Sequence, residues 1–142
     1  MRYSKSALER LTEPFEGDRL VAYQDSKGVW TIGYGHTRGV FPGMTCSQQQ
    51  SERWLIEDLA WAEAMVNRFV KVQLTQNEFD ALVDFVFNVG SGNFKSSTLL
   101  KLVNANDMED AVREFVKWDH CGGKEVAGLL RRRQAEAQLF SK

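Results

Sequence analysis

Two short β-prone runs joined by a turn constrain the fold of this chain most. They are LVAYQ at 20–24 and VWTIGYGH at 29–36, and the turn DSKG lies between them. An aspartate at the start and a glycine at the end of four residues are typical of a reverse turn, so the segment predicts an antiparallel hairpin. Along the second run, Thr31, Gly33 and Gly35 share one face. Because glycines leave the backbone uncovered, we expect this face to border a groove that a ligand can enter.

Almost everything outside the hairpin is predicted to be helical. A first helix is expected from Ser6, and because Pro14 removes a backbone donor, its geometry should change in the last turn, just before Glu16. A long helix is predicted from Ser47, with an apolar stripe that Trp61 helps to widen. The segment 75–89 is apolar nearly all round, which is typical of a helix in the centre of a bundle. Shorter helices are expected near 97–104 and 107–118, and a last one over 129–140.

These elements predict one domain of the α+β class that is mostly helical. A chain of 142 residues can build one sizeable core but not two independent ones. We expect a small N-terminal lobe with the hairpin at about 1–46, a connecting helix at about 47–69 and a helical lobe at about 70–142. A cleft between the two lobes is the expected place for a ligand.

Composition and charge argue against several classes of protein. The formal net charge of −1 is unlike the basic excess of a dedicated nucleic-acid binder. No run has the apolar length of a signal peptide or a membrane span, so we expect a protein that is made and stays in a cytosol, without stable membrane insertion. No metal site is expected from two histidines, and Cys46 and Cys121 are expected to be free thiols.

The C-terminal end carries a local excess of positive charge. Five basic and two acidic residues lie between Lys124 and Lys142. We interpret this segment as a solvated helix face, and the alternative is a surface that contacts an acidic polymer. No aromatic residues interleave with Arg131–Arg133, which weakens a nucleic-acid role further.

Glu16, Asp25 and Thr31 are the candidate catalytic residues. Singly, each has an ordinary explanation as a helix end, a turn former and a strand residue. Together, the helix end and the turn bring two carboxylates and a hydroxyl to one opening. Two carboxylates across a gap are the equipment of glycoside hydrolysis, in which one gives a proton to the leaving oxygen and the other side supports positive charge and activates water.

The segment EGDRLVAYQDSKGVWTIGYGHT, residues 16–37, resembles the catalytic signature of the lysozymes (endolysins) of tailed bacteriophages. The similarity extends through QNEFDALVDFVFNVGSGNFKSSTLLKLVN and the closing GLLRRRQAEAQLF, so it covers most of the chain. In that family the Glu, Asp and Thr at this spacing are the catalytic residues, and they carry over as Glu16, Asp25 and Thr31. Arg132 matches a family arginine that lies near the acid.

The resemblance implies an N-acetylmuramidase with a lysozyme-like fold that needs no cofactor. It would hydrolyse the β-1,4 bond between N-acetylmuramic acid and N-acetylglucosamine in peptidoglycan. Glu16 would be the general acid, while Asp25 and Thr31 would position the attacking water and support an oxocarbenium-like transition state. By the same similarity, sugar contacts are expected from three further residues: Thr37, Phe87 and Thr98.

The implied setting is host cell lysis. We expect a monomer that stays in the host cytoplasm until a holin or another agent breaches the membrane, and that then acts on periplasmic peptidoglycan. The short side chain of Asp25, paired with the Thr31 hydroxyl, looks suited to hold a water, so both the residues and the resemblance favour inversion at the anomeric carbon.

Two other functions compete with a hydrolase. A lytic transglycosylase breaks the same bond with the 6-hydroxyl of its own substrate and needs no carboxylate to hold a water, so Asp25 with Thr31 favours hydrolysis. A non-catalytic wall-binding module would keep the groove and lose the acid, whereas Glu16 is present. His36 is expected to bond a carboxylate and not to act as a catalytic base.

Overall fold

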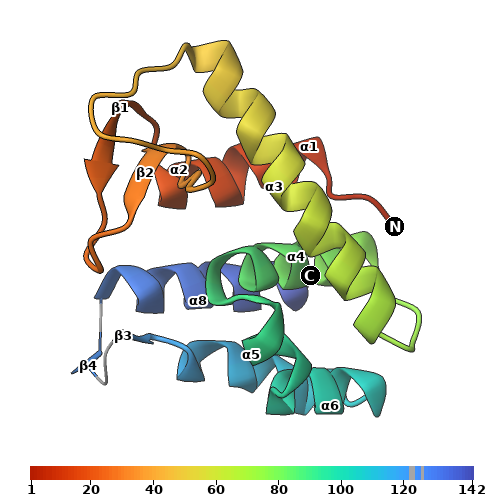
Figure 1. Cartoon of the computed structure of the whole chain (residues 1–142). Helices are drawn as coiled ribbons and strands as arrows, with labels where there is room; N and C mark the ends of the chain where they lie inside the picture. Colours follow the sequence, from red (N-terminus) through yellow and green to blue (C-terminus); the bar gives the residue numbers. More distant parts are fainter. Residues whose placement is uncertain (122–123, 126) are drawn as a thin grey trace.

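The structure, a computed structural model, describes residues 1–121, 124–125 and 127–142 and shows a short N-terminal helical segment, a β-hairpin and then a set of helices (Figure 1). This is the mostly helical α+β fold that the sequence predicts. No helix in those ranges is both long and apolar enough to span a membrane. The elements in chain order are α1 (Lys5–Ala7), the π-helix η1 (Leu8–Thr12), α2 (Glu13–Glu16), β1 (Arg19–Gln24), β2 (Trp30–Gly33), α3 (Gln48–Phe69), α4 (Gln76–Val89), α5 (Ser91–Lys95), α6 (Thr98–Asn104), α7 (Met108–Ala111), the 3-10 helix η2 (Val112–Lys117), β3 (His120–Cys121), β4 (Lys124–Glu125) and α8 (Ala127–Phe140).

The first helix begins earlier than predicted and changes geometry earlier too. Its N-cap is Ser4 and not Ser6, because the Ser4 hydroxyl accepts the Ala7 N–H at 3.1 Å and donates to Asp80 on α4 at 2.5 Å. The widened turn η1 ends at Thr12, two residues before Pro14, which has no N–H to continue an ordinary helical ladder. The following turn, α2, ends at Gly17 with φ 64° and carries Glu16 at its last position.

The hairpin forms as predicted and gains a third strand-like segment. Strands β1 and β2 pair in antiparallel register with Tyr23 opposite Thr31, and a bulge interrupts β1 before that pair. On the other edge of β1, residues 44–46 run alongside, with Ala22 N–H donating to Met44 O at 2.8 Å. This segment covers the edge that a two-stranded hairpin would leave open.

Helix α4 is the centre of the molecule. Thr75 and Glu78 form a capping box, and the helix ends before Gly90 as expected. It packs against α3 on one side and α8 on another (Figure 1). The Phe85 ring meets the rings of Phe115 at 5.5 Å and Trp118 at 5.8 Å, both edge-on. Aromatic contacts of this kind hold residues 115–118 against α4.

Two interpretations of surface residues were wrong. The C-terminal basic run is not a solvated helix face throughout, because Arg132 is 4% exposed and Arg133 is 0% exposed. Trp61 does not widen the buried stripe of α3 but is 46% exposed. Cys46 is a free thiol as predicted. The prediction for Cys121 falls on side chains 121–126, which lie outside the described part of the chain.

Candidate active site

A cleft of about 740 Å³ lies between the hairpin, the end of α2, α3 and the last turn of α4. It brings together all three candidate catalytic residues, Glu16, Asp25 and Thr31. Two of the expected sugar contacts, Thr37 and Phe87, also line it, whereas Thr98, exposed at the first position of α6, is not among the lining residues. The lining of the cleft therefore does not support the expectation that Thr98 contacts a sugar.

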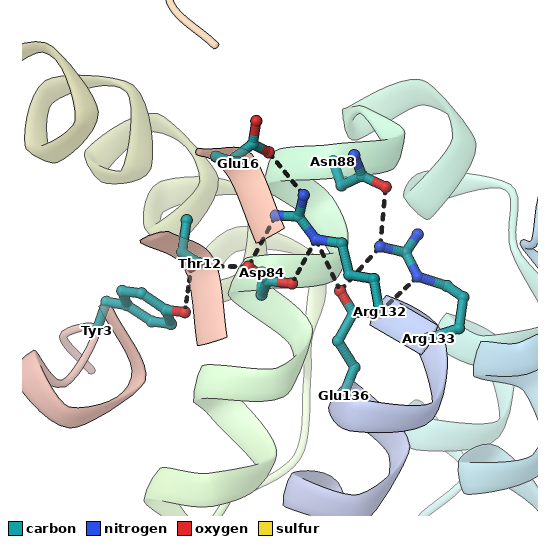
Figure 2. Close-up of polar contacts among 8 residues, drawn as sticks. All are labelled: Tyr3, Thr12, Glu16, Asp84, Asn88, Arg132, Arg133 and Glu136. Carbon is teal, nitrogen blue, oxygen red and sulfur yellow. Dashed lines mark hydrogen bonds and ion pairs between the residues drawn. The ribbon is translucent and has the colours of Figure 1, made fainter. Parts of the chain in front are cut away.

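Glu16 is held by an arginine, as the resemblance implied. Its Oε1 accepts from Arg132 Nη1 at 2.7 Å, and the carboxyl side chain is 17% exposed (Figure 2). Arg132 is bound from the other side by Asp84 on α4, which accepts from Nε at 3.0 Å and from Nη2 at 2.9 Å. Because the buried Asp84 already compensates the guanidinium, Glu16 faces a paired cation and not a free one.

Asp84 is itself the centre of a chain of buried hydrogen bonds. Thr12 donates to its Oδ1 at 2.7 Å, and Thr12 bonds the Tyr3 hydroxyl at 2.7 Å (Figure 2). Burial alone would raise the pKa of Asp84, but Arg132 and these hydrogen bonds outweigh it and lower the pKa to about 2. The chain ties the N-terminal helix, which carries Glu16, to α4 and α8.

Glu136 anchors the arginines from within α8. It lies 3.9 Å from Arg132 Nε and 2.7 Å from Arg133 Nε, and its side chain is fully buried. Burial, together with the neighbouring Asp84, raises the pKa of Glu136 well above its ordinary value, although both arginines act in the opposite direction.

Asp25 is fixed by the turn that it begins. Its Oδ1 accepts the N–H groups of Lys27 at 2.8 Å and Val29 at 2.9 Å. Its Oδ2 has no hydrogen-bond partner in the parts of the chain that the structure describes. The turn therefore orients the carboxylate and leaves one oxygen for a molecule in the cleft.

Thr31 has a hydroxyl whose proton is already engaged. Its Oγ1 donates to Val29 O at 2.9 Å, and the residue is 4% exposed. A hydroxyl has a single proton, so toward the cleft this group can act only as an acceptor. Asp25 and Thr31 are thus both oriented by the backbone of Val29, and both present acceptor oxygens.

His36 is bonded to a carboxylate, as predicted. Its Nδ1 lies 3.0 Å from Asp58 Oδ2, and its ring stacks on Trp54 with centroids 4.5 Å apart. Arg38 donates to the other oxygen of Asp58 at 3.3 Å. This group forms the part of the cleft wall where α3 meets the hairpin.

Five lining residues were not predicted as site residues from the sequence: Tyr23, Arg38, Asp58, Trp61 and Asn88. Trp61 could not be told from a core residue, because it falls within an apolar helix pattern. The sequence did contain an indication that Asn88 belongs to the site. This residue is the one polar residue in FVFNVG, at the end of an otherwise apolar stretch and next to Phe87.

The comparisons with known proteins agree on one family. A family model described as phage lysozyme matches residues 13–136. The chain is 46% identical over 134 residues to an endolysin of Acyrthosiphon pisum secondary endosymbiont phage 1, covering 92% of each chain. It is 40% identical over 145 residues to an endolysin of Salmonella phage P22, covering 99% of this chain and 98% of that one. The muramidase domain of SpmX from Asticaccaulis excentricus superimposes with a TM-score of 0.92 at 36% identity, covering 99% of this chain and 98% of that one.

Proposed function

Because the chain belongs to the phage lysozyme family and is a peptidoglycan-hydrolysing glycosidase, we propose that it cleaves the β-1,4 bond between N-acetylmuramic acid and N-acetylglucosamine, with Glu16 as the general acid. The observation that carries the proposal is that one cleft contains Glu16 together with an oriented pair of acceptors, Asp25 and Thr31. A protonated Glu16 gives its proton to the oxygen of the leaving sugar as the glycosidic bond breaks.

Asp25 and Thr31 are suited to hold the attacking water. A water has two protons, and Asp25 Oδ2 with Thr31 Oγ1 offers one acceptor for each. With both protons engaged, the water's lone pair is free to attack the anomeric carbon. As the new C–O bond forms, Asp25 takes up a proton, and its negative charge supports the oxocarbenium-like transition state before that.

The two competing functions have less support. A transglycosylase needs no held water, so the Asp25–Thr31 pair favours hydrolysis, and the family and its muramidase-like neighbours do not favour that alternative. A non-catalytic wall-binding module has no use for a carboxyl held at the cleft by Arg132.

Glu16→Gln tests the assignment of the acid. The glutamine keeps the size of the side chain and an oxygen for Arg132, so the fold should be retained, as judged by circular dichroism. Turbidity clearance of permeabilised Gram-negative cells should fall by at least about 100-fold, the low end of general acid catalysis. Clearance within about tenfold of wild type would show that another group supplies the proton.

Access to the substrate adds a proposal about localisation. The family's substrate lies beyond the cytoplasmic membrane, which supports an enzyme that waits in the host cytoplasm for a holin or another agent to breach that membrane. Cells that express the chain alone should keep growing until chloroform is added, followed through optical density. Prompt lysis of cells with intact membranes would contradict this route.

A further inference from the structure

Arg133, the neighbour of Arg132 on α8, is a buried arginine that holds a residue of the cleft. Its Nη2 donates to Asn88 Oδ1 at 2.8 Å, and the side chain is fully buried (Figure 2). Asn88 is exposed in the last turn of α4 and lines the cleft that contains Glu16 and Asp25. The hydrolytic mechanism above uses neither Arg133 nor Asn88.

The bond from Arg133 fixes the direction of the Asn88 amide. A guanidinium group has donors and no acceptor, so the amide must turn its oxygen toward Arg133. The Nδ2 group, with its two protons, is then left for other partners. In the described parts of the chain it donates to no protein oxygen. An exposed amide in a cleft therefore has a fixed orientation and an unused donor.

Arg133 is firmly held, so it can orient a partner. Its Nη2 also donates to Glu136 Oε2 at 2.9 Å, and its guanidinium lies 5.1 Å from the centre of the Phe85 ring. Glu136 also lies beside Arg132, which binds Glu16. One anchored pair of arginines thus orients two side chains of the same cleft, a carboxyl and an amide.

We propose that Asn88 binds the glycan directly: its Nδ2 donates a hydrogen bond to a carbonyl or carboxylate oxygen carried by a sugar in the cleft, and Arg133 is the positioning residue that presents it. This inference rests on the proposed function. Both wall sugars carry an acetamido carbonyl, and muramic acid also carries a lactyl group. The recognised chemistry is the same in either case, an acceptor oxygen on a substituent of the sugar ring.

Asn88→Asp is the sharpest test, because it keeps an oxygen for Arg133 and replaces the donor with an acceptor. Loss of one neutral hydrogen bond corresponds to about a three- to tenfold weaker interaction, and two facing acceptors add repulsion, so KM should rise about tenfold or more. The kcat should stay within about threefold and the Tm should not fall, since the acid and the core are untouched. Asn77→Asp, in the first turn of the same helix and outside the cleft, makes the same charge change and should leave KM unchanged.

Two substrates identify the acceptor. A rise in KM on both chitooligosaccharide and muramic acid-containing glycan assigns it to the acetamido group, and a rise on the second alone assigns it to the lactyl substituent. A KM within about twofold of wild type on both would overturn the proposal. Turnover by the wild-type enzyme in the same assays reports on the proposed function separately.

A spectroscopic measurement does not depend on turnover. In the Glu16→Gln variant, the side-chain NH₂ signals of Asn88, identified by their loss in Asn88→Asp, should shift on addition of chitotetraose. Arg133→Met should abolish that shift by releasing the amide. Side-chain signals that stay in place at saturating sugar in the Glu16→Gln variant would also overturn the proposal.

Discussion

At the scale of single residues, Gly35 lies where a side chain would meet the Glu16 carboxyl. An added Cβ on Gly35 would lie 2.7 Å from Glu16 Oε2, and the glycine has φ +79°. Both the backbone conformation and the neighbouring carboxyl therefore require glycine at this position. The glycine-rich face of the hairpin leaves space beside the backbone, and the Glu16 carboxyl fills part of that space.

Gly35→Ala should displace Glu16 and cost much of the activity. Gly43→Ala is a matched control, because Gly43 has φ +81° and nothing within 4 Å of an added Cβ. Both variants should lose about 1 kcal/mol of unfolding free energy for the left-handed backbone. Only Gly35→Ala should lose kcat, measured by wall clearance at a temperature where both variants are folded. Equal activities would show that Glu16 tolerates the methyl group.

The candidate catalytic residues could be singled out from the sequence because their positions depend on local structure. Glu16 follows from a helix that ends at Gly17, and the turn that begins at Asp25 sets its distance from Thr31. Thr98 could not be placed this way, because its position depends on how α6 packs on the rest of the molecule. The bonds that orient Asp25 and Thr31 also lay beyond prediction, since they meet at backbone atoms of Val29.

At the scale of elements, α8 is the part of the chain that the sequence described least well. Its three consecutive arginines predict a solvated face, but α8 packs against α4 and buries two of them. The carboxylates that make this burial possible come from α2, α4 and α8 itself. Such pairings join residues up to 116 positions apart, which no local pattern can encode.

Asp84→Asn tests the buried network through its pH dependence. Removing one partner of a buried pair should cost about 3–5 kcal/mol of unfolding free energy at pH 7. Asp84 has a pKa lowered from its ordinary 3.8 to about 2. The stabilisation that ionised Asp84 contributes is therefore fully present above its pKa in the unfolded state. It is lost as the pH falls through its pKa in the folded state. The difference between wild type and variant should shrink by about 2 kcal/mol between pH 5 and pH 2.

Urea unfolding across that range measures the effect. Asp110→Asn is the control, because Asp110 pairs with Arg113 at 2.6 Å on the surface, where its side chain is 54% exposed. An exposed pair contributes about 1 kcal/mol or less, with no comparable loss toward low pH. A stability difference for Asp84→Asn that does not change with pH would contradict an ionised Asp84 in the folded protein.

At the scale of the whole molecule, the N-terminal helix that precedes the hairpin is bound to the helices that follow the hairpin. The sequence predicted the hairpin, the long helix and the central helix within a few residues of their observed bounds. The division into lobes at about 1–46 and 70–142 stays a prediction. The helix before the hairpin is tied to α4 by bonds from Ser4 to Asp80 and from Thr12 to Asp84. Glu16 is thus fixed to α4 and α8, while Asp25 and Thr31 belong to the hairpin.

Because different elements hold Glu16 and the pair of Asp25 and Thr31, their arrangement bears on the stereochemistry of the reaction. A retaining enzyme needs its second carboxylate close enough to bond the anomeric carbon, whereas an inverting one leaves room for a water. Asp25 has a short side chain that the turn holds through Oδ1, and Thr31, which lines the cleft, has a hydroxyl that can act there only as an acceptor. A water with one proton on each of these oxygens would lie between the carboxylate and the sugar. We therefore expect inversion, with the α-anomer as the first product of cleaving the β-linkage.

Proton NMR during the first minutes of a muropeptide digest can follow the anomeric signals before mutarotation. An initial α-signal that decays toward equilibrium is the expected result. An initial β-signal, or a glycosyl adduct on Asp25 detected by mass spectrometry, would mean that Asp25 attacks the sugar itself. An anhydro end in place of either anomer would identify the substrate's own hydroxyl as the nucleophile. If the reaction is inverting, Asp25→Ala should slow it. The attacking water would still have the Thr31 oxygen as an acceptor, but it would lose the carboxylate that takes up its proton.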